Sequence, residues 1–164
     1  MIPLAVPNLS GREAEYLQQC VSSNFVSTIG PFVQTFEVLA AELMGFSQAV
    51  ATNTGTSALH VAMKVLGVRP DDLVVLPSYT FVATANAVRM CGANPWLFDI
   101  DADGWGIDAS LLASEFARVT QLRDGFLWHK DLNRRVGAVV AVCAAGQPPR
   151  LKEIGKVATD FNVP

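Results

Sequence analysis

The residues best suited to chemistry form a short polar turn, Thr54-Gly55-Thr56-Ser57, between an apolar segment and an apolar helical pattern. The segment before it, residues 48–52, is predicted to be a short buried strand. A strand that runs through such a turn into a helix leaves the first backbone N–H groups of the helix free, and these favour a phosphate. Gly55 lets a ligand approach the backbone, and the neighbouring hydroxyls add donors. The same residue types also cap helices that bind nothing, so the turn alone leaves both interpretations open.

Two further loops are expected beside this turn. Residues 77–81 follow the apolar run 73–76, and residues 144–148 follow the apolar run 136–143. Ligands of parallel sheets bind outside the carboxyl ends of the strands, so all three loops are predicted to open on one edge and to form one pocket. In that pocket Tyr79 or Phe81 could stack on a planar cofactor, although core packing is the alternative for either ring.

The elements that must position these loops alternate between helix and strand. Apolar spacing and capping residues predict helices over 10–21, 32–43, 57–66, 81–90, 109–119 and 151–161, and strands over 73–76, 94–100 and 136–143. The spacing of Ser10 and Glu13 is typical of a capping box, and Asp108 is expected to cap the helix that follows it. The helix over 57–66 is apolar nearly all round and is expected to be buried. Residues 120–135 remain a polar connection without assigned structure. The order predicts an α/β fold with a mainly parallel sheet and helices on both faces.

Composition limits the possible classes of protein. The chain has 164 residues, 51% of them hydrophobic and 16% charged, which suits one ordinary globular domain. Its net charge of -3 comes without a basic cluster, so no nucleic-acid partner is predicted. Pro3 and Pro7 interrupt the first apolar run, which also lacks a basic region, so no signal peptide is expected. No apolar run approaches the length that spans a bilayer, and the prediction is a cytoplasmic protein without a membrane partner.

Cysteine and histidine give no metal site. Cys20, Cys91 and Cys143 are widely spaced in apolar surroundings and are expected to be reduced packing residues. His60 and His129 have no partner at a ligand spacing, so no metal is predicted.

Three ordered motifs carry a resemblance to a known family. They are FVSTIGPFV at residues 25–33, TGTSALH at 54–60 and PSYTFVATANAV at 77–88. Together they resemble the DegT/DnrJ/EryC1/StrS family, whose members are pyridoxal-phosphate-dependent aminotransferases of keto sugars carried on nucleotides. The resemblance runs from about residue 2 to the end of the sequence.

The resemblance implies a fold and a set of binding residues. The fold implied is the large domain of the aspartate-aminotransferase type, PLP fold type I, in incomplete form. The amide of Gly55 with Thr56 and Ser57 would hold the phosphate of pyridoxal 5'-phosphate, and Phe81 would stack on its ring. Residues 27–31, with Ser27, Thr28 and Gly30 as substrate-binding candidates, would lie near the nucleotide sugar. The division implied is an arm, helix and substrate loop over 1–35 and part of the cofactor-binding domain over 36–164. Glutamate would be the amino donor, and a homodimer the assembly.

Other family features have no counterpart in the sequence. Family members are roughly twice as long and continue into an acid that pairs with the pyridinium nitrogen and a Schiff-base lysine, so no catalytic residue is assigned. The lysines at 64, 130, 152 and 156 match no family motif and are expected at the surface. The sequence is therefore interpreted as an N-terminal portion, inactive alone. Ala141 stands where the family commonly has Pro, and Trp105-Gly106 is unusual in its turn.

Two alternatives stay open at this point. One is a dehydratase of the same family, in which histidine replaces the Schiff-base lysine. The other is a non-catalytic binding module for sugar nucleotides or a regulatory relative.

Overall fold

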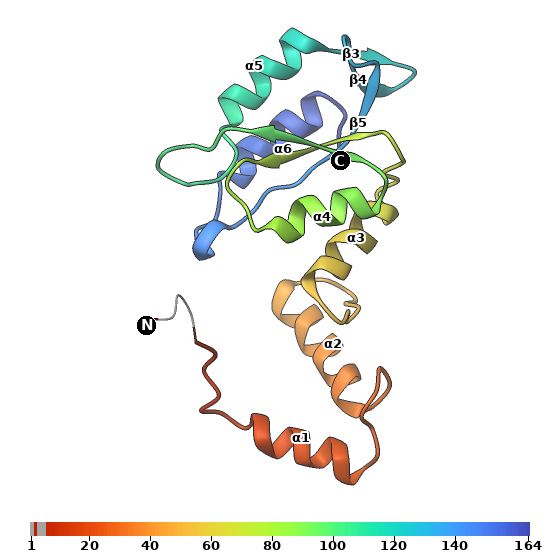
Figure 1. Ribbon diagram of the computed structural model, residues 1–164, viewed down its shortest axis with the longest axis vertical. Helices are drawn as coiled ribbons and strands as arrows, with labels where there is room; N and C mark the ends of the chain where they lie inside the picture. The colour runs from red at the N-terminus through yellow and green to blue at the C-terminus, as the bar shows by residue number, and fades with distance from the viewer. Residues whose placement is uncertain (1, 3–5) are drawn as a thin grey trace. The chain divides into compact units, whose positions relative to one another are not determined.

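The computed structural model describes residues 2 and 6–164 (Figure 1). Residues 1 and 3–5, which include Pro3 of the expected N-terminal arm, lie outside the described residues. The chain divides into two compact units, Met1–Ala51 and Thr52–Pro164. The division after residue 35 that the sequence suggested rests on the expected substrate loop and stays a prediction.

The first unit contains two helices, α1 (Glu13–Ser22) and α2 (Pro31–Met44). The Tyr16 and Phe32 rings pack with their centroids 5.1 Å apart and join the two helices. Pro31 begins α2 at a position where a missing N–H costs nothing, and Gly45 ends it with a left-handed φ of 71°. Residues 23–30, which include most of the predicted substrate loop over 27–31, form the connection between the two helices.

Two predictions for this unit are wrong. Helix α1 begins at Glu13 rather than at Ser10, and no side chain caps it, because Arg12 holds the N-cap position. The Ser10 amide instead donates to Asn8 Oδ1 at 3.1 Å in a local turn. The strand predicted over residues 48–52 is absent: no ladder partner lies beside it among the described residues, and Val50 is 83% exposed. A strand needs a neighbour to accept its hydrogen bonds, and apolar composition cannot supply one.

The second unit is built on a five-stranded sheet with the order β2-β1-β5-β4-β3. Its strands are β1 (Leu73–Pro77), β2 (Asn94–Phe98), β3 (Thr120–Arg123), β4 (Phe126–His129) and β5 (Arg134–Val139). Strands β2, β1 and β5 are parallel, and β4 and β3 continue the sheet antiparallel. The mainly parallel sheet predicted from the sequence is therefore confirmed. All five residues of β1 are buried, as expected for a central strand covered on both faces.

Helices cover both faces of this sheet (Figure 1). On one face, α3 (Gly55–Val65) and α4 (Val82–Met90) pack over Val74 and Leu76. On the other, α5 (Ala109–Val119) and α6 (Leu151–Asp160) pack over Val75. Successive side chains of a strand point to opposite faces, so β1 contributes to both cores. The predicted helices over 81–90, 109–119 and 151–161 are thus confirmed.

Helix α3 differs from its prediction in burial. Its nearly all-round apolar pattern predicts a buried helix, yet Met63 is its one buried residue in the described chain. Val61 is 52% exposed and Val65 80% exposed. Apolar residues on every side of a helix show what it could bury, but the sheet offers it only one face.

The connection over residues 120–135 contains a β-hairpin that was not predicted. Strands β3 and β4 are joined by Asp124 and Gly125, which have left-handed φ values of 52° and 79°. Both central residues of a two-residue type I′ turn need positive φ, and Asp-Gly supplies it. Residues 130–133 form the next turn, which leads into β5.

The amino ends of the parallel strands are closed by a buried ion pair. Arg135 on β5 pairs with Asp72, which precedes β1; the two side chains are 10% and 6% exposed. Arg135 Nε donates to Asp72 Oδ1 at 3.0 Å, and its terminal nitrogen donates to the Gly67 carbonyl at 2.6 Å. The Arg69 amide donates to Asp72 Oδ2 at 2.7 Å. The hydrogen bonds that Arg135 donates to the Asp72 carboxylate raise the pKa of the Arg135 guanidinium above its already high ordinary value.

Candidate cofactor site at the carboxyl edge

Three loops and the first turn of α3 lie at the carboxyl edge of the parallel strands. The loops 78–81, 99–108 and 140–150 leave the ends of β1, β2 and β5, which lie side by side and parallel. Helices α3 and α4 both end at the opposite edge, where the Asp71 amide donates to the Gly92 carbonyl at 3.0 Å. Both helices therefore run antiparallel to β1, and their first turns face the carboxyl edge. This is the edge on which the sequence predicted a pocket.

The first turn of α3 has free hydrogen-bond donors. Thr54 is the N-cap: its hydroxyl accepts the Ser57 amide at 3.1 Å, and its carbonyl accepts the Ala58 amide at 3.0 Å. Within the described chain, the amides of Gly55 and Thr56 donate to no protein group. A Cβ built on Gly55 would meet nothing within 4 Å, so the space in front of the turn is open. Two unpartnered amides at the positive end of a helix dipole suit an oxyanion such as phosphate.

The predicted donors are not equally free. The Thr54 and Ser57 hydroxyl oxygens lie 3.1 Å apart and bond to each other. Thr56 has no such contact among the described residues and is partly exposed. The cap therefore uses one amide of the turn and leaves two amides and the Thr56 hydroxyl for a ligand.

The loop 78–81 presents an aromatic ring. The Ser78 amide donates to the Phe98 carbonyl at 2.7 Å, and the Thr80 hydroxyl bonds to the Thr84 hydroxyl at 2.9 Å. Phe81 is the N-cap of α4 and is 79% exposed. A phenylalanine so exposed at the carboxyl edge contributes nothing to the core, and its face is available to a planar group.

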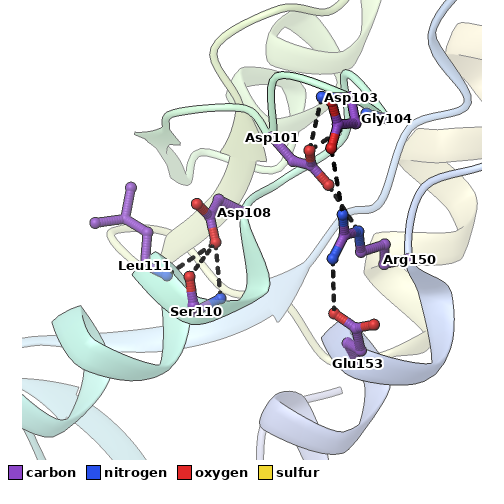
Figure 2. A network of polar contacts seen from close by, with 8 residues as sticks. All are labelled: Asp101, Asp103, Gly104, Asp108, Ser110, Leu111, Arg150 and Glu153. Atoms are coloured by element: carbon purple, nitrogen blue, oxygen red, sulfur yellow. Dashed lines mark hydrogen bonds and ion pairs between the residues drawn. The ribbon is translucent and has the colours of Figure 1, made fainter.

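The loop 99–108 is held by a polar network (Figure 2). The Asp101 carboxylate accepts the amides of Asp103 at 2.8 Å and Gly104 at 3.3 Å, and pairs with Arg150 Nε at 2.8 Å. Arg150 precedes α6, so the ion pair ties the loop after β2 to the loop after β5. At the carboxyl edge, these two loops are therefore held together by an ion pair, whereas the first turn of α3 keeps free donors.

Asp108 closes the same loop as the predicted N-cap of α5. Its carboxylate accepts the Ser110 amide at 2.8 Å, the Leu111 amide at 3.1 Å and the Ser110 hydroxyl at 2.6 Å. These bonds, led by the one from the Ser110 side chain, hold the pKa of Asp108 below its usual value.

The carboxyl edge also contains unusual backbone. Seven non-glycine residues of the described chain have positive φ, and five are Asn or Asp, which tolerate this conformation. The other two, Trp105 with φ 56° and Ala145 with φ 49°, follow β2 and β5 on this edge. Backbone in such conformations is concentrated at functional sites, where the surrounding structure holds it in place.

The three substrate candidates lie in the other compact unit. Ser27, Thr28 and Gly30 belong to the loop that precedes α2, and Gly30 is its N-cap. A Cβ on Gly30 would lie 3.0 Å from the Phe25 Cβ, so the ring of Phe25 packs closely on this glycine. Their role at a nucleotide sugar stays a prediction.

The lysines lie at the surface as predicted, whereas the cysteines match their prediction only in part. The four lysines are exposed; Lys156 pairs with Asp160 at 2.6 Å, and Lys130 donates to the Arg118 carbonyl at 2.9 Å. Burial raises the pKa of the Cys91 thiol, consistent with a packing residue, whereas Cys143 is exposed and so is not one. Among the described residues, no group of three or more His, Cys, Asp and Glu could hold a metal ion. Nor does any helix there have the length and apolarity to cross a bilayer.

Known proteins are similar in sequence to most of this chain. The model of the DegT/DnrJ/EryC1/StrS aminotransferase family matches residues 7–164. The chain is 40% identical over 111 residues to a GDP-perosamine synthase of Caulobacter vibrioides, covering 68% of the chain and 30% of the relative. It is 36% identical over 163 residues to the putative pyridoxal phosphate-dependent aminotransferase EpsN of Bacillus subtilis, covering 99% of the chain and 39% of the relative.

Solved structures share the fold. DesI, determined in the presence of its TDP-sugar product, superposes with a TM-score of 0.72 at 31% identity over 93% of the chain and 34% of DesI. An E. coli GDP-4-keto-6-deoxy-D-mannose-3-dehydratase with bound hydrated PLP gives 0.74 at 20% identity, over 98% of the chain and 39% of the enzyme. The second unit therefore has the fold of PLP fold type I aminotransferases, as predicted.

The chain belongs to the DegT/DnrJ/EryC1/StrS aminotransferase family. The cofactor predicted from the resemblance, pyridoxal 5'-phosphate, agrees with the family and with a relative that is named as dependent on it. The chain spans between 30% and 40% of the length of the curated relatives that it matches.

Proposed function

We propose that this chain is the N-terminal part of an aminotransferase that uses pyridoxal 5'-phosphate to transfer an amino group to a nucleotide-linked keto sugar. The observation that carries the proposal is the pair of free amides at Gly55 and Thr56, which face the same edge as the exposed Phe81 in a chain of an aminotransferase family. Glutamate is proposed as the amino donor.

In this proposal the first turn of α3 binds the phosphate. The Gly55 and Thr56 amides and the Thr56 hydroxyl donate to the phosphate oxygens, while Thr54 keeps the helix capped through Ser57. The Ser57 hydroxyl, which contacts Thr54, can rotate to donate outward because a hydroxyl both donates and accepts. The dipole of an 11-residue helix adds to this attraction for a dianion.

Phe81 orients the cofactor ring. An exposed phenylalanine that covers one face of a pyridine ring excludes water from that face and fixes the plane in which the ring lies. The cofactor itself supplies an electron sink for the bond changes at the amino carbon. The chain's part is to fix the phosphate at one end and the ring plane at the other.

Substrate binding and assembly complete the proposal. Ser27, Thr28 and Gly30 would contact the nucleotide sugar, and a homodimer would bring a second chain to the pocket. The catalytic acid and the Schiff-base lysine would come from the part of the protein that the relatives have beyond the matched region. A cytoplasmic location is part of the same proposal.

Cofactor binding by this chain can be measured directly. Titration with pyridoxal 5'-phosphate and with pyridoxal should show tighter binding of the phosphorylated form to the wild type. The double variant Thr56→Ala/Ser57→Ala should lose much of that preference, about tenfold or more for two lost charge-assisted hydrogen bonds. The matched control is Thr159→Ala, which removes an exposed hydroxyl bonded only to the Gly155 carbonyl. Equal affinity of wild type and double variant for pyridoxal 5'-phosphate contradicts the site.

The reaction needs the longer protein. Loaded with cofactor and given L-glutamate without acceptor, it should release 2-oxoglutarate in an amount equal to the bound cofactor. A non-catalytic binding module would release none. No oxoglutarate from a cofactor-loaded protein therefore contradicts the aminotransferase proposal.

A further inference from the structure

Two aromatic rings meet at the carboxyl edge next to the loop that carries Phe81. Tyr79 and Trp105 pack edge to face, with ring centroids 6.0 Å apart and an interplanar angle of 87°. With Ile100 they line an open hollow of about 220 Å³. Tyr79 is 53% and Trp105 45% exposed, and neither ring belongs to the two buried cores of the described chain. The contact is therefore made at the surface of the site.

The backbone of Trp105 has an energetically unfavourable conformation. Its φ of 56° is left-handed, a conformation that bulky side chains rarely adopt. Asn or Gly would occupy this position with less strain, so a large ring here needs a reason other than the turn. Strain of this kind persists only where neighbouring structure fixes it.

The surrounding loop does fix it. The Trp105 amide donates to the Asp101 carbonyl at 2.9 Å, and the Asp101 amide donates to the Gly106 carbonyl at 2.8 Å. The Asp101 carboxylate is clamped by Arg150 (Figure 2). A Cβ at Gly106 would overlap the buried Pro149, so the end of the turn packs directly on the loop after β5. The turn that carries Trp105 is therefore held in place by hydrogen bonds, an ion pair and close packing.

The loop with Tyr79 has fewer restraints. Its backbone is tied at Ser78 to β2 and at Thr84 to the Phe81 carbonyl. Between these ties, the amides of residues 79–81 donate to no group in the part of the chain that the structure describes. The Trp105 ring is an aromatic contact to this stretch from another loop.

We propose that Trp105 is a positioning residue for the loop 78–81, which carries Phe81. Its ring, held by the braced turn 101–106, restrains Tyr79 and so fixes residues 79–81 in the conformation that presents Phe81 to the cofactor. The role rests on the proposed function, because Phe81 needs a fixed direction only if it covers a ligand ring. Trp105 itself touches no reacting group.

Three variants separate the ring from the backbone. Trp105→Asn deletes the ring and favours the left-handed conformation, so the fold should melt at the wild-type temperature or slightly above. Trp105→Phe keeps a ring at the same position. Trp128→Phe, in the hairpin under Arg123, is the control for loss of a tryptophan elsewhere.

The first measurement needs no ligand. Backbone 15N order parameters of residues 79–81 should be about 0.85 in the wild type and in Trp105→Phe, and fall below about 0.6 in Trp105→Asn. The second is affinity for pyridoxal 5'-phosphate, which should weaken roughly three- to tenfold in Trp105→Asn and remain within about twofold in the other two variants.

The two measurements test different statements. Unchanged order parameters in Trp105→Asn overturn the positioning role, whatever the affinity. A loosened loop with unchanged affinity overturns its connection to the cofactor. Failure of the wild type to bind pyridoxal 5'-phosphate contradicts the proposed function instead, and the order parameters still show whether Trp105 restrains the loop.

Discussion

The two edges of the parallel strands treat polar groups in opposite ways. At the amino edge, Asp72 and Arg135 are buried, and both carboxylate oxygens of Asp72 accept a hydrogen bond. At the carboxyl edge, the Gly55 and Thr56 amides have no protein partner in the described chain, and Phe81 stands exposed. The polar groups of the amino edge are paired within the protein, and those at the first turn of α3 remain available for the ligand of the proposed function. The left-handed backbone of Trp105 and Ala145, which is unfavourable for these residue types, is also found at the carboxyl edge.

Removal of the buried charge at Asp72 should have the largest effect. Asp72→Asn leaves Arg135 buried without a counterion, which typically costs about 3–5 kcal/mol and is a large part of the stability of an ordinary domain. Urea unfolding followed by tryptophan fluorescence measures it, since all three tryptophans lie in the second unit. The matched control is Asp71→Asn, whose pair with Arg134 is exposed and 3.7 Å long and should contribute below about 1 kcal/mol. Similar losses in both variants would remove the distinction between the edges.

The close packing at the same edge predicts the next effect. A Cβ at Gly137 would lie 2.8 Å from Asp72 Oδ2, an oxygen that Arg135 and the Arg69 amide hold in place. Gly137→Ala should therefore destabilise the second unit by about 1–3 kcal/mol. Gly155→Ala in α6 is the control: nothing lies within 4 Å of its Cβ, so it should stabilise by about 0.5–1 kcal/mol. A neutral Gly137→Ala would mean that the ion pair is loosely held.

The cap at Asp108 should show a smaller effect that depends on pH. Asp108→Ala removes the acceptor for Ser110 and Leu111 and should cost about 1 kcal/mol near neutral pH. The folded-state pKa of Asp108 is lowered, so its contribution is present above the ordinary carboxyl pKa of about 3.9 and is lost as the pH falls below it.

Unfolding curves between pH 7 and pH 2.5 test this sign. The difference in the free energy of unfolding between wild type and Asp108→Ala should become smaller as the pH falls. Asp108→Asn can cap the helix but does not titrate, so its stability should lack the pH dependence that Asp108 contributes. A gap that widens at low pH would show that the carboxylate does not stabilise the folded state.

Most of the second unit could be predicted from local patterns. The continuous apolar run of β1, the Asp108 cap of α5 and the end of α4 at Met90 each depend on near neighbours in the sequence, and all three are confirmed. The hairpin was missed although Asp124-Gly125 is a strong turn signal between Leu122 and Phe126. Attention to that dipeptide would have found it.

Other features depend on contacts that no local pattern carries. The strand predicted over 48–52 fails because pairing needs a partner, and α3 is exposed because only one of its sides meets the sheet. The sequence marked the turn at 54–57 and the ring of Phe81, but the contact of Tyr79 with Trp105 joins residues of two loops whose approach is set by the sheet. The pair of Asp72 with Arg135, 63 residues apart, was unpredictable for the same reason.

The central claim is that the first amides of α3 hold the phosphate of the cofactor. Gly55→Pro removes one of these donors and leaves the helix intact, because proline suits the first helical position and Thr54 is extended at φ -153° and ψ 158°. Gly55→Ala keeps the donor and is the matched control. Affinity for pyridoxal 5'-phosphate should fall about tenfold or more in Gly55→Pro, with less loss in Gly55→Ala and no change in pyridoxal binding. Equal affinity of wild type and a folded Gly55→Pro variant for pyridoxal 5'-phosphate would contradict the claim.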